Sequence, residues 1–524
     1  MKKNVFVFVV VFSAIISMVG AVGYAQELPA WADYHKRQRQ FSAAEFVTGF
    51  CSEEGIPPGS ADETLQRLAS YARQQLLESV YVSIKSTGLF KVTNVNAQTH
   101  ESFSKSSISR TSLNLSNLKT ETFYHRKTRT AYAFARASKS GLVSTHKELL
   151  HKYAATIKRK VDAAVAFEEQ GALQPAMKNW FEALPVFREA EASYQLMLAL
   201  APAELPAVEQ SLGSMNLLKN KVTGRIARYQ QGYGLGLSDV AFFMARGYKL
   251  QTSKPQFAVR LEHFTYRNTG MTSRFSARFA SVLEKYLVDV ADFPVVSGTS
   301  GQNPYSQVQG FGEENPEVRY VLDGTFLEDG DRLNIISVLR HADTGVAIAS
   351  MEGALPLSAL DIAVRPANYE VAIKNLQTLS TDVPPGNDLV LEAWTNKGSQ
   401  ALLYQTGETM KVFLQVNKPC YVRFVYHTAD GEQVLLLDNY FIDEKYVNQA
   451  FEVPEEFVCT APYGVEMLQV NVQSKPFDRL PTRQEDGYVY VLSTVDQALA
   501  STRGFKKKEK VLSAEKLLQI TTLE

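Results

Sequence analysis

The clearest alternation of hydrophobic and polar positions lies in the C-terminal part of the chain, over residues 407–476. Short runs of β-branched and aromatic residues are separated there by turn residues, at Asn417-Lys418-Pro419 and at Asp430-Gly431. This pattern predicts consecutive antiparallel strands, and Asp430-Gly431 is the best hairpin signal. We therefore expect a β-sandwich of about six or seven strands over residues 389–500.

The N-terminal part mixes two periodicities, which predicts an α+β domain over residues 26–138. Residues 97–118 are rich in Ser, Thr and Asn and predict a loop or polar edge strands. The other predicted elements are strands over residues 46–51, 80–84 and 130–136, and a helix that starts at the capping box Ser60-Ala61-Asp62-Glu63.

Residues 139–231 are dominated by Ala, Leu, Glu, Lys and Gln, which predicts a helical arm of about three or four helices. Residues 163–184 look like one tetratricopeptide-type helical pair, but one unit is too few for a solenoid. A spacer is therefore expected, with a peptide-binding groove as the alternative. Helix breaks are expected at Gly171, Pro175, Pro185, Pro202 and Pro206.

An α/β module is predicted over residues 237–360, after a glycine-rich hinge at residues 231–236. That hinge has neither the preceding strand nor the lysine of a phosphate-binding loop. Residues 361–388 are expected to be a linker and residues 501–524 a basic tail. The predicted elements of the module are helices over 239–250 and 273–289, strands over 257–261 and 293–296, and a three-stranded meander over 319–326, 333–339 and 346–351.

Residues 1–25 have the pattern of a secretory signal peptide. A basic start at Lys2-Lys3 precedes an apolar run, and Gly23-Tyr24-Ala25 supplies small residues for cleavage after Ala25. The alternative is an uncleaved membrane anchor, because the apolar run approaches spanning length. No cysteine lies near the cleavage site to carry a lipid, and no later segment is apolar enough to span a bilayer.

The composition is that of globular protein, with 45% hydrophobic residues among 524. The 55 basic and 55 acidic residues cancel, which argues against nucleic acid as the partner. In an oxidising compartment Cys420 and Cys459 could form a disulfide, and two buried, reduced thiols are the open alternative. Cys51 is expected to be a buried small hydrophobe.

No catalytic, metal or cofactor site is predicted. The eight histidines lack companions at metal-ligand spacing. Ser102-x-x-Lys105 and Ser116-x-x-Lys119 have the spacing of a serine–lysine nucleophile, but the other elements of such enzymes do not follow. Carboxylates are plentiful, but a hydrolase would need them to converge across a cleft.

Three stretches resemble known domain families. Residues 27–138, through Leu28-Pro29-Ala30-Trp31 and Tyr132-Ala133-Phe134-Ala135, resemble a small domain of Gram-negative envelope lipoproteins and flagellar outer-membrane assembly proteins. The lipid-bearing cysteine of those lipoproteins is absent. Residues 237–360, through the strand Tyr320-Val321-Leu322-Asp323-Gly324-Thr325, look like the flagellar outer-membrane-protein and curli-secretion-lipoprotein superfamily. This likeness implies α/β modules used for assembly and contacts.

The C-terminal part resembles a bacterial domain of unknown function. The matching residues are Tyr404-x-x-Gly407-Glu408, Asn417-Lys418-Pro419-Cys420-Tyr421-Val422 and Gly464-Val465-Glu466. Because that domain recurs in secreted bacterial proteins, often joined to other modules, the resemblance implies a secreted protein of this kind and no reaction.

Together these observations predict a multidomain α+β, non-catalytic, exported envelope protein, periplasmic or associated with the outer membrane. It would act in assembly or in contacts with other envelope proteins, and Lys506-Lys507-Lys508 could touch an acidic lipid surface. One alternative is a binding module for cell-wall glycan or another extracellular ligand; another is an envelope hydrolase. The glycan alternative predicts exposed aromatic residues on one face of the sandwich, with Tyr421, Tyr426, Tyr440 and Tyr446 as candidates.

Overall fold

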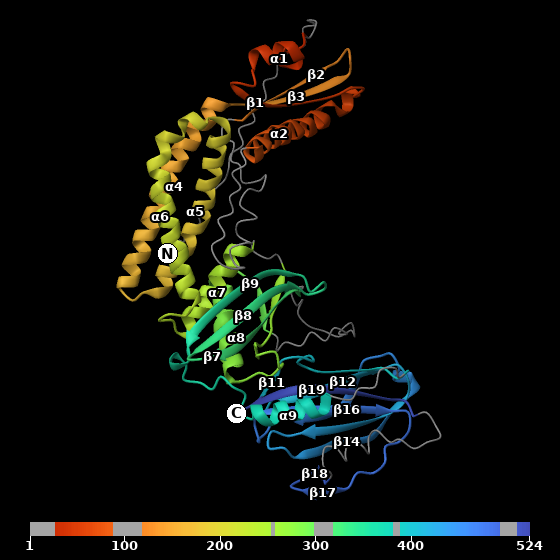
Figure 1. Ribbon diagram of the computed structural model, residues 1–524. Coiled ribbons are helices and arrows are strands. Elements are labelled where there is room, and N and C mark those ends of the chain that lie inside the picture. Colours follow the sequence, from red (N-terminus) through yellow and green to blue (C-terminus); the bar gives the residue numbers. More distant parts are fainter. Residues whose placement is uncertain (1–26, 87–117, 253–256, 298–317, 381–387, 493–510) are drawn as a thin grey trace, which may run out of the picture. The chain divides into compact units, whose positions relative to one another are not determined.

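The computed structural model describes residues 27–86, 118–252, 257–297, 318–380, 388–492 and 511–524 (Figure 1). By internal contacts the chain divides into two compact units. The first holds the described residues up to His151 and the segment Ala190–Glu209, and the second holds the rest. The division therefore falls inside long helices, whereas the sequence predicted a separate helical arm.

The first unit contains a three-stranded antiparallel sheet with the order β1-β3-β2. Its strands are β1 (Phe46–Glu53), β2 (Lys119–His125) and β3 (Thr130–Ser138), so the strands predicted at 46–51 and 130–136 are confirmed. Helix α2 (Ala61–Ser86) packs on one face, so closely that a Cβ on Gly49 would lie 2.0 Å from the carbonyl oxygen of Ala72. Short segments η1 (Ala30–Ala32) and α1 (Tyr34–Gln40) precede β1. The Trp31 ring stacks on the Phe134 ring, with 5.8 Å between the ring centroids.

The strand predicted at residues 80–84 is wrong, because α2 continues through it. Leu68, Ala72, Leu76 and Val80 follow one another at four-residue spacing and are all buried against the sheet. This packing keeps the β-branched residues helical despite their strand propensity. Of the polar stretch predicted over residues 97–118, only residue 118 belongs to the part of the chain that the structure describes.

Three long helices follow, α4 (Lys139–Glu169), α5 (Leu173–Leu200) and α6 (Glu209–Gln230), with η3 (Pro202–Val208) before the last. The breaks predicted at Gly171 and Pro202 are confirmed, but Pro185 lies inside α5 and Pro175 in its first turn. The long buried face of α5, including Trp180, offsets the hydrogen bond lost at Pro185.

A polar cluster joins these three helices. The carboxylate of Glu168 on α4 accepts hydrogen bonds from Trp180 Nε1 (2.9 Å) and from the Tyr229 hydroxyl (2.5 Å). Arg225 lies 3.5 Å from the same carboxylate. Glu168 therefore ties α5 and α6 to α4 through one partly buried side chain.

The α/β module has helices α7 (Leu237–Gln251) and α8 (Arg274–Asp289) on one face of a sheet of order β6-β4-β7-β8-β9 (Figure 1). Strands β7, β8 and β9 form the predicted antiparallel meander. Tyr248 on α7 reaches Ser337 on β8, with 2.6 Å between the hydroxyls. The strands of this sheet are β4 (Ala258–Leu261), β5 (Thr265–Tyr266), β6 (Val295–Ser297), β7 (Val318–Asp329), β8 (Arg332–His341) and β9 (Ala347–Pro356).

The C-terminal module is a β-sandwich, as predicted, but the described residues give it ten strands. Inner faces of both sheets share one core that includes Val412, Leu414, Phe424, Leu468 and Ile520. The smaller sheet has the order β10-β12-β15, from β10 (Leu391–Thr395), β12 (Thr409–Val416) and β15 (Phe451–Val458). The larger has the order β11-β19-β16-β13-β14-β18-β17, from β11 (Leu402–Gln405), β13 (Cys420–His427), β14 (Gln433–Ile442), β16 (Val465–Gln473), β17 (Thr482–Glu485), β18 (Tyr488–Val491) and β19 (Ser513–Leu523).

Two predictions about this module need correction. The hairpin at Asp430-Gly431 is confirmed, with β13 and β14 antiparallel, but residues 417–419 carry the chain from one sheet to the other. Strands β12 and β13 therefore do not pair. The tail predicted over 501–524 contains β19, which lies between β11 and β16 with Leu518 and Ile520 buried.

The segment predicted as a linker, residues 361–388, contains helix α9 (Tyr369–Ser380). From α9, Ala372 packs against Val465 and Leu379 packs against Met467, and these two partners are on β16. The Asn368 side chain adds hydrogen bonds to backbone atoms of Ala429 and Val465. The helix covers the outer face of β16, so this segment is part of the folded unit.

None of the helices that the structure describes combines the length and the apolar character needed to cross a bilayer.

Candidate functional site: a tyrosine-lined pocket in the sandwich

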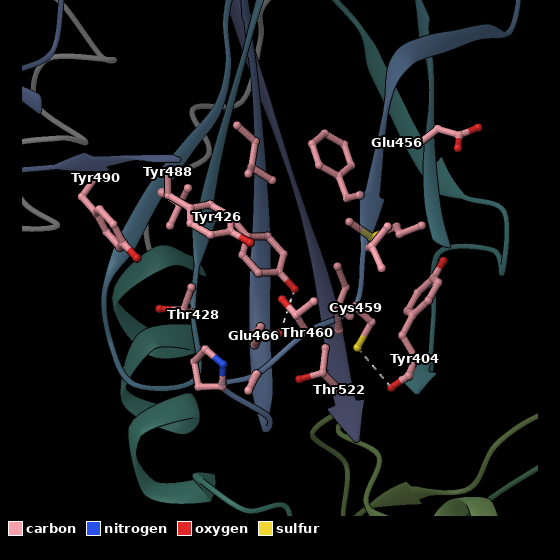
Figure 2. A pocket seen from close by; sticks show the side chains of 18 residues that line it. Tyr404, Tyr426, Thr428, Glu456, Cys459, Thr460, Glu466, Tyr488, Tyr490 and Thr522 are labelled. Carbon is pink, nitrogen blue, oxygen red and sulfur yellow. Dashed lines mark hydrogen bonds between the residues drawn. The ribbon is translucent and has the colours of Figure 1, made fainter. Parts of the chain in front are cut away.

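A pocket of about 330 Å³ opens between the two sheets of the sandwich (Figure 2). Strands from both sheets contribute to its wall, and the segment after β15 closes one side. Aromatic and aliphatic side chains dominate, as is usual for sites that bind small molecules. The lining residues are Tyr404, Met410, Tyr426, Thr428, Val434, Leu436, Glu456, Phe457, Val458, Cys459, Thr460, Ala461, Pro462, Glu466, Tyr488, Tyr490, Ile520 and Thr522.

The pocket contains one buried carboxyl group, that of Glu466 at the start of β16. Side chains alternate between the two faces of a strand. Val465 and Met467 face α9, whereas Leu468, Val470 and Val472 face the sandwich core. Glu466 thus takes the first inward position, and only 4% of it is exposed.

The Glu466 carboxyl is held by neutral donors. The Tyr426 hydroxyl donates to Oε2 (2.8 Å) and the Ala429 N–H donates to Oε1 (3.2 Å). Burial raises the pKa of Glu466 to about 7, although hydrogen bonds from Tyr426, Thr522 and Ala429 act in the opposite direction. Burial also raises the pKa of Tyr426. The result is a carboxyl group that titrates near neutral pH inside an apolar pocket.

The four tyrosines singled out in the sequence do not gather on one exposed face. Tyr426 lines the pocket, and Tyr440 packs against the inter-sheet core. Tyr421 contacts Phe441 at 4.8 Å, and Tyr446 contacts Phe451 at 4.9 Å. Tyr446 is 37% exposed, whereas Tyr426 and Tyr440 pack inside the sandwich, so the four residues do not share one exposed face.

All three cysteines are free thiols in the structure. Cys420 lies in the sandwich core, and burial raises its pKa to about 11. Cys459 lines the pocket, where its Sγ lies 3.8 Å from the carbonyl oxygen of Tyr404. The structure thus presents the two cysteines in different surroundings, without the disulfide between them.

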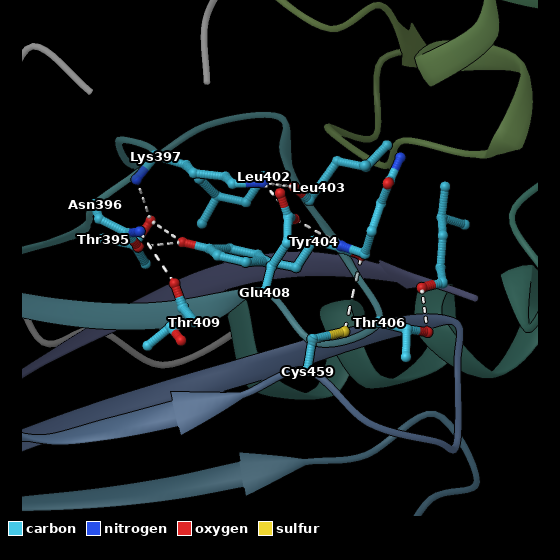
Figure 3. Close-up of polar contacts among 12 residues, drawn as sticks. Thr395, Asn396, Lys397, Leu402, Leu403, Tyr404, Thr406, Glu408, Thr409 and Cys459 are labelled. Atoms are coloured by element: carbon cyan, nitrogen blue, oxygen red, sulfur yellow. Dashed lines mark hydrogen bonds and ion pairs between the residues drawn. The ribbon is translucent and has the colours of Figure 1, made fainter. Parts of the chain in front are cut away.

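The motif Tyr404-x-x-Gly407-Glu408 forms the turn between β11 and β12 (Figure 3). Gly407 has a φ of +82°, which favours glycine. The Glu408 carboxylate accepts from the Gln405 N–H (2.7 Å) and from Lys397 Nζ (2.6 Å). Burial opposes ionisation of Glu408, but these hydrogen bonds outweigh it and lower its pKa.

Tyr404 itself links this turn to β10. Its hydroxyl donates to Thr395 Oγ1 (2.9 Å) or Asn396 Oδ1 (2.7 Å), and Lys397 Nζ lies 4.5 Å from its ring centroid (Figure 3). The motif therefore has a structural role, and it also fixes one wall of the pocket.

Candidate chemistry elsewhere is sparse. Among the described residues, no three His, Cys, Asp or Glu side chains group as metal ligands would. Glu456, the other acid in the pocket lining, pairs with Lys411 at 3.0 Å. His146 and His427 are buried beside Ser193 and Gln469. Ser102, Lys105 and Ser116 lie outside the described residues.

Sequence reasoning named Tyr426 only as a candidate exposed aromatic, and it did not single out Glu466, Tyr488 or Tyr490. Glu466 entered only as part of a resemblance motif. A carboxylate at an inward position of a strand whose next inward positions are Leu468 and Val470 is the signal that could have revealed it. The tyrosines of β18 gave no such signal, because only the pairing of β18 with β14 brings them to the pocket.

Comparison with protein families gives one match, to a family described as a domain of unknown function (DUF4384), over residues 403–476. This match agrees with the resemblance seen in the sequence and contains Tyr404, Tyr426, Cys459 and Glu466. A search of curated proteins found no match.

Solved structures with weak similarity to this chain include a domain of LpoB and a secreted protein. The LpoB C-terminal domain from Escherichia coli is 18% identical, with a TM-score of 0.19, covering 23% of this chain and 98% of that one. The secreted protein HP1454 from Helicobacter pylori is 11% identical, with a TM-score of 0.18, covering 64% of this chain and 99% of that one. TM-scores this low do not establish a shared fold.

Proposed function

We propose that this chain is a non-catalytic, exported cell-envelope protein that acts through contacts with other envelope proteins. Export is supported by the signal-peptide pattern of residues 1–25. The observation that supports protein contacts most directly is the open face of the β7-β8-β9 meander.

Helices α7 and α8 cover only one face of this sheet. On β8, Leu333, Ile335 and Leu339 are buried toward the helices. Ile336, on the opposite face, is 40% exposed, as is Ile348 on β9. A face with exposed aliphatic side chains next to the Asp323–Arg340 ion pair (3.6 Å) has the mixed character of protein-binding surfaces.

Site-specific photocrosslinking in living cells tests this proposal. A photoreactive amino acid is placed at Ile336 or Ile348, and the matched control position is Val288, 48% exposed on α8. We expect a covalent adduct with the same one or two envelope proteins from both sheet positions and none from Val288. Adducts absent from the sheet, or equal at all three positions, would reject the sheet face as a contact surface.

Export has its own test. N-terminal sequencing of the protein from the envelope fraction should begin at Gln26, the residue after the expected cleavage site. Recovery of the chain in the cytoplasm with Met1 intact would contradict the export part of the proposal.

A second candidate function, binding of a small extracellular ligand, is favoured by the pocket in the sandwich. Its apolar walls and few inward polar groups are typical of ligand sites. This function does not compete with the first, because the pocket and the open sheet face belong to different modules.

A further inference from the structure

The pocket in the sandwich holds an acid without a basic partner. Glu466 is its only deeply buried charged group, and no lysine, arginine or histidine is among the pocket-lining residues that the structure describes. Burying a carboxylate without a counter-charge is costly. A ligand that brought a positive charge would therefore remove an electrostatic cost already built into the fold.

Nearby basic side chains are already paired with other acids. Lys397 lies against Tyr404 but forms its ion pair with Glu408 (2.6 Å). Arg483 lies against Tyr490, 4.8 Å from its ring centroid, and pairs with Glu432 (3.3 Å) and Glu485 (3.0 Å). The other acid that acts on Glu466, Asp430, raises its pKa further, so it too favours an incoming cation.

The rest of the wall suits the same ligand. Tyr404, Tyr426, Phe457, Tyr488 and Tyr490 supply the aromatic rings of the pocket lining. The hydroxyl of Tyr426 reaches the Glu466 carboxyl (Figure 2). Aromatic faces attract cations, and quaternary or primary ammonium groups are commonly held by several rings together. A volume of about 330 Å³ is at the small end for ligand pockets, which limits the ligand to a compact molecule.

We propose that this pocket binds a small organic ammonium compound, with its charged nitrogen at Glu466 and its apolar body against the surrounding tyrosine rings. The inference rests on the second candidate function and adds the chemical class of the ligand. The Tyr426 and Thr522 hydroxyls and the Ala429 N–H orient the carboxyl, and these three donors leave one of its four lone pairs for a further donor.

Isothermal titration calorimetry on the mature full-length protein tests the proposal with two probes of the same shape. One is 2-phenylethylammonium and the other is the neutral 2-phenylethanol. At pH 8, above the pKa of about 7 for Glu466, we expect the ammonium probe to bind at least about tenfold more tightly than the alcohol. Glu466→Gln should reduce this preference to within about twofold.

A matched control is Glu444→Gln, which changes an exposed acid of the same module outside the pocket lining and should leave both affinities unchanged. If Glu466→Gln failed to fold, the comparison of the two probes on the unmodified protein would still decide.

Equal binding of the two probes would overturn the ammonium assignment and leave the second candidate function standing. Binding of neither probe at millimolar concentration would overturn both. A preference for the ammonium probe that survives Glu466→Gln would also overturn the assignment, because the charge would then be recognised elsewhere.

Discussion

Arg423 on β13 offers the sharpest test of the interactions that hold the sandwich together. Its side chain is fully buried on the outer side of the large sheet. Nε donates to Asp438 Oδ1 (2.6 Å), Nη2 donates to the Asp478 carbonyl (2.7 Å), and the guanidinium lies 4.5 Å from the Phe477 ring centroid. Asp438 is the only acid that pairs with it among the described residues.

Replacing Asp438 by Ala would leave a buried guanidinium with a carbonyl and a ring as partners. Breaking a fully buried ion pair costs about 3–5 kcal/mol. The Asp438 side chain keeps 30% exposure, so water can take its place in part, and we expect a loss of about 2–3 kcal/mol. With a urea m-value of about 2 kcal/mol/M, the unfolding midpoint should fall by about 1–1.5 M.

The unfolding midpoint of the sandwich in the intact chain can be measured by hydrogen exchange with mass spectrometry across a urea series. Peptides from β13 and β16 report the sandwich, and peptides from β1 and β3 in the first unit serve as an internal reference that should not change. The matched variant is Glu432→Ala, which breaks an ion pair between side chains that are 46% and 49% exposed. Such pairs contribute about 0–1 kcal/mol, so its midpoint should hardly move. Equal shifts for Asp438→Ala and Glu432→Ala would refute the reasoning.

Three further predictions concern other modules and the pocket. Gly49→Ala places a Cβ 2.0 Å from a backbone oxygen of α2, and thermal unfolding should show a loss of stability of about 2–3 kcal/mol. The control Gly59→Ala, whose Cβ has nothing within 4 Å, should leave stability nearly unchanged. The pKa of Glu466 is raised from 4.5 in the unfolded chain to about 7 in the folded one. As the pH rises, the unfolded chain therefore releases this proton at a lower pH than the folded chain does. The free energy of unfolding should fall by about 3 kcal/mol between about pH 4.5 and pH 7. Urea midpoints at several pH values should show that Glu466→Gln lacks this fall; an unchanged slope would contradict it. Glu168→Ala leaves two donors without their acceptor and should cost about 2 kcal/mol by thermal melting, against less than about 0.5 for Asp162→Ala in an exposed helix pair.

Local pattern identified most of the elements correctly. The meander of residues 318–356 was readable because its turns contain Gly330 and Gly345, both at positive φ, between strands of β-branched residues. The helices at 237–251 and 274–289 were readable because their buried positions repeat at helical spacing. These signals lie within a dozen residues of one another.

The errors arose where distant contacts outweighed local preference. Val80 is β-branched, but it lies in a helix because Leu76 and Ala72 place it on a buried face against the sheet. Residues 513–523 follow a lysine-rich stretch, but Leu518 and Ile520 enter the sandwich core beside β16. The neighbouring residues in the sequence do not predict either contact.

The sequence by itself determined the strand and helix periodicities of most elements. Only the tertiary structure decided the pocket, because its wall joins positions from Tyr404 to Thr522 through the pairing of strands that are far apart in the chain. The same holds for Glu466, whose inward position follows from strand alternation. Its raised pKa, however, follows from burial beneath a second sheet. Periodicity is a property of neighbours, whereas burial and charge pairing depend on which distant strands meet.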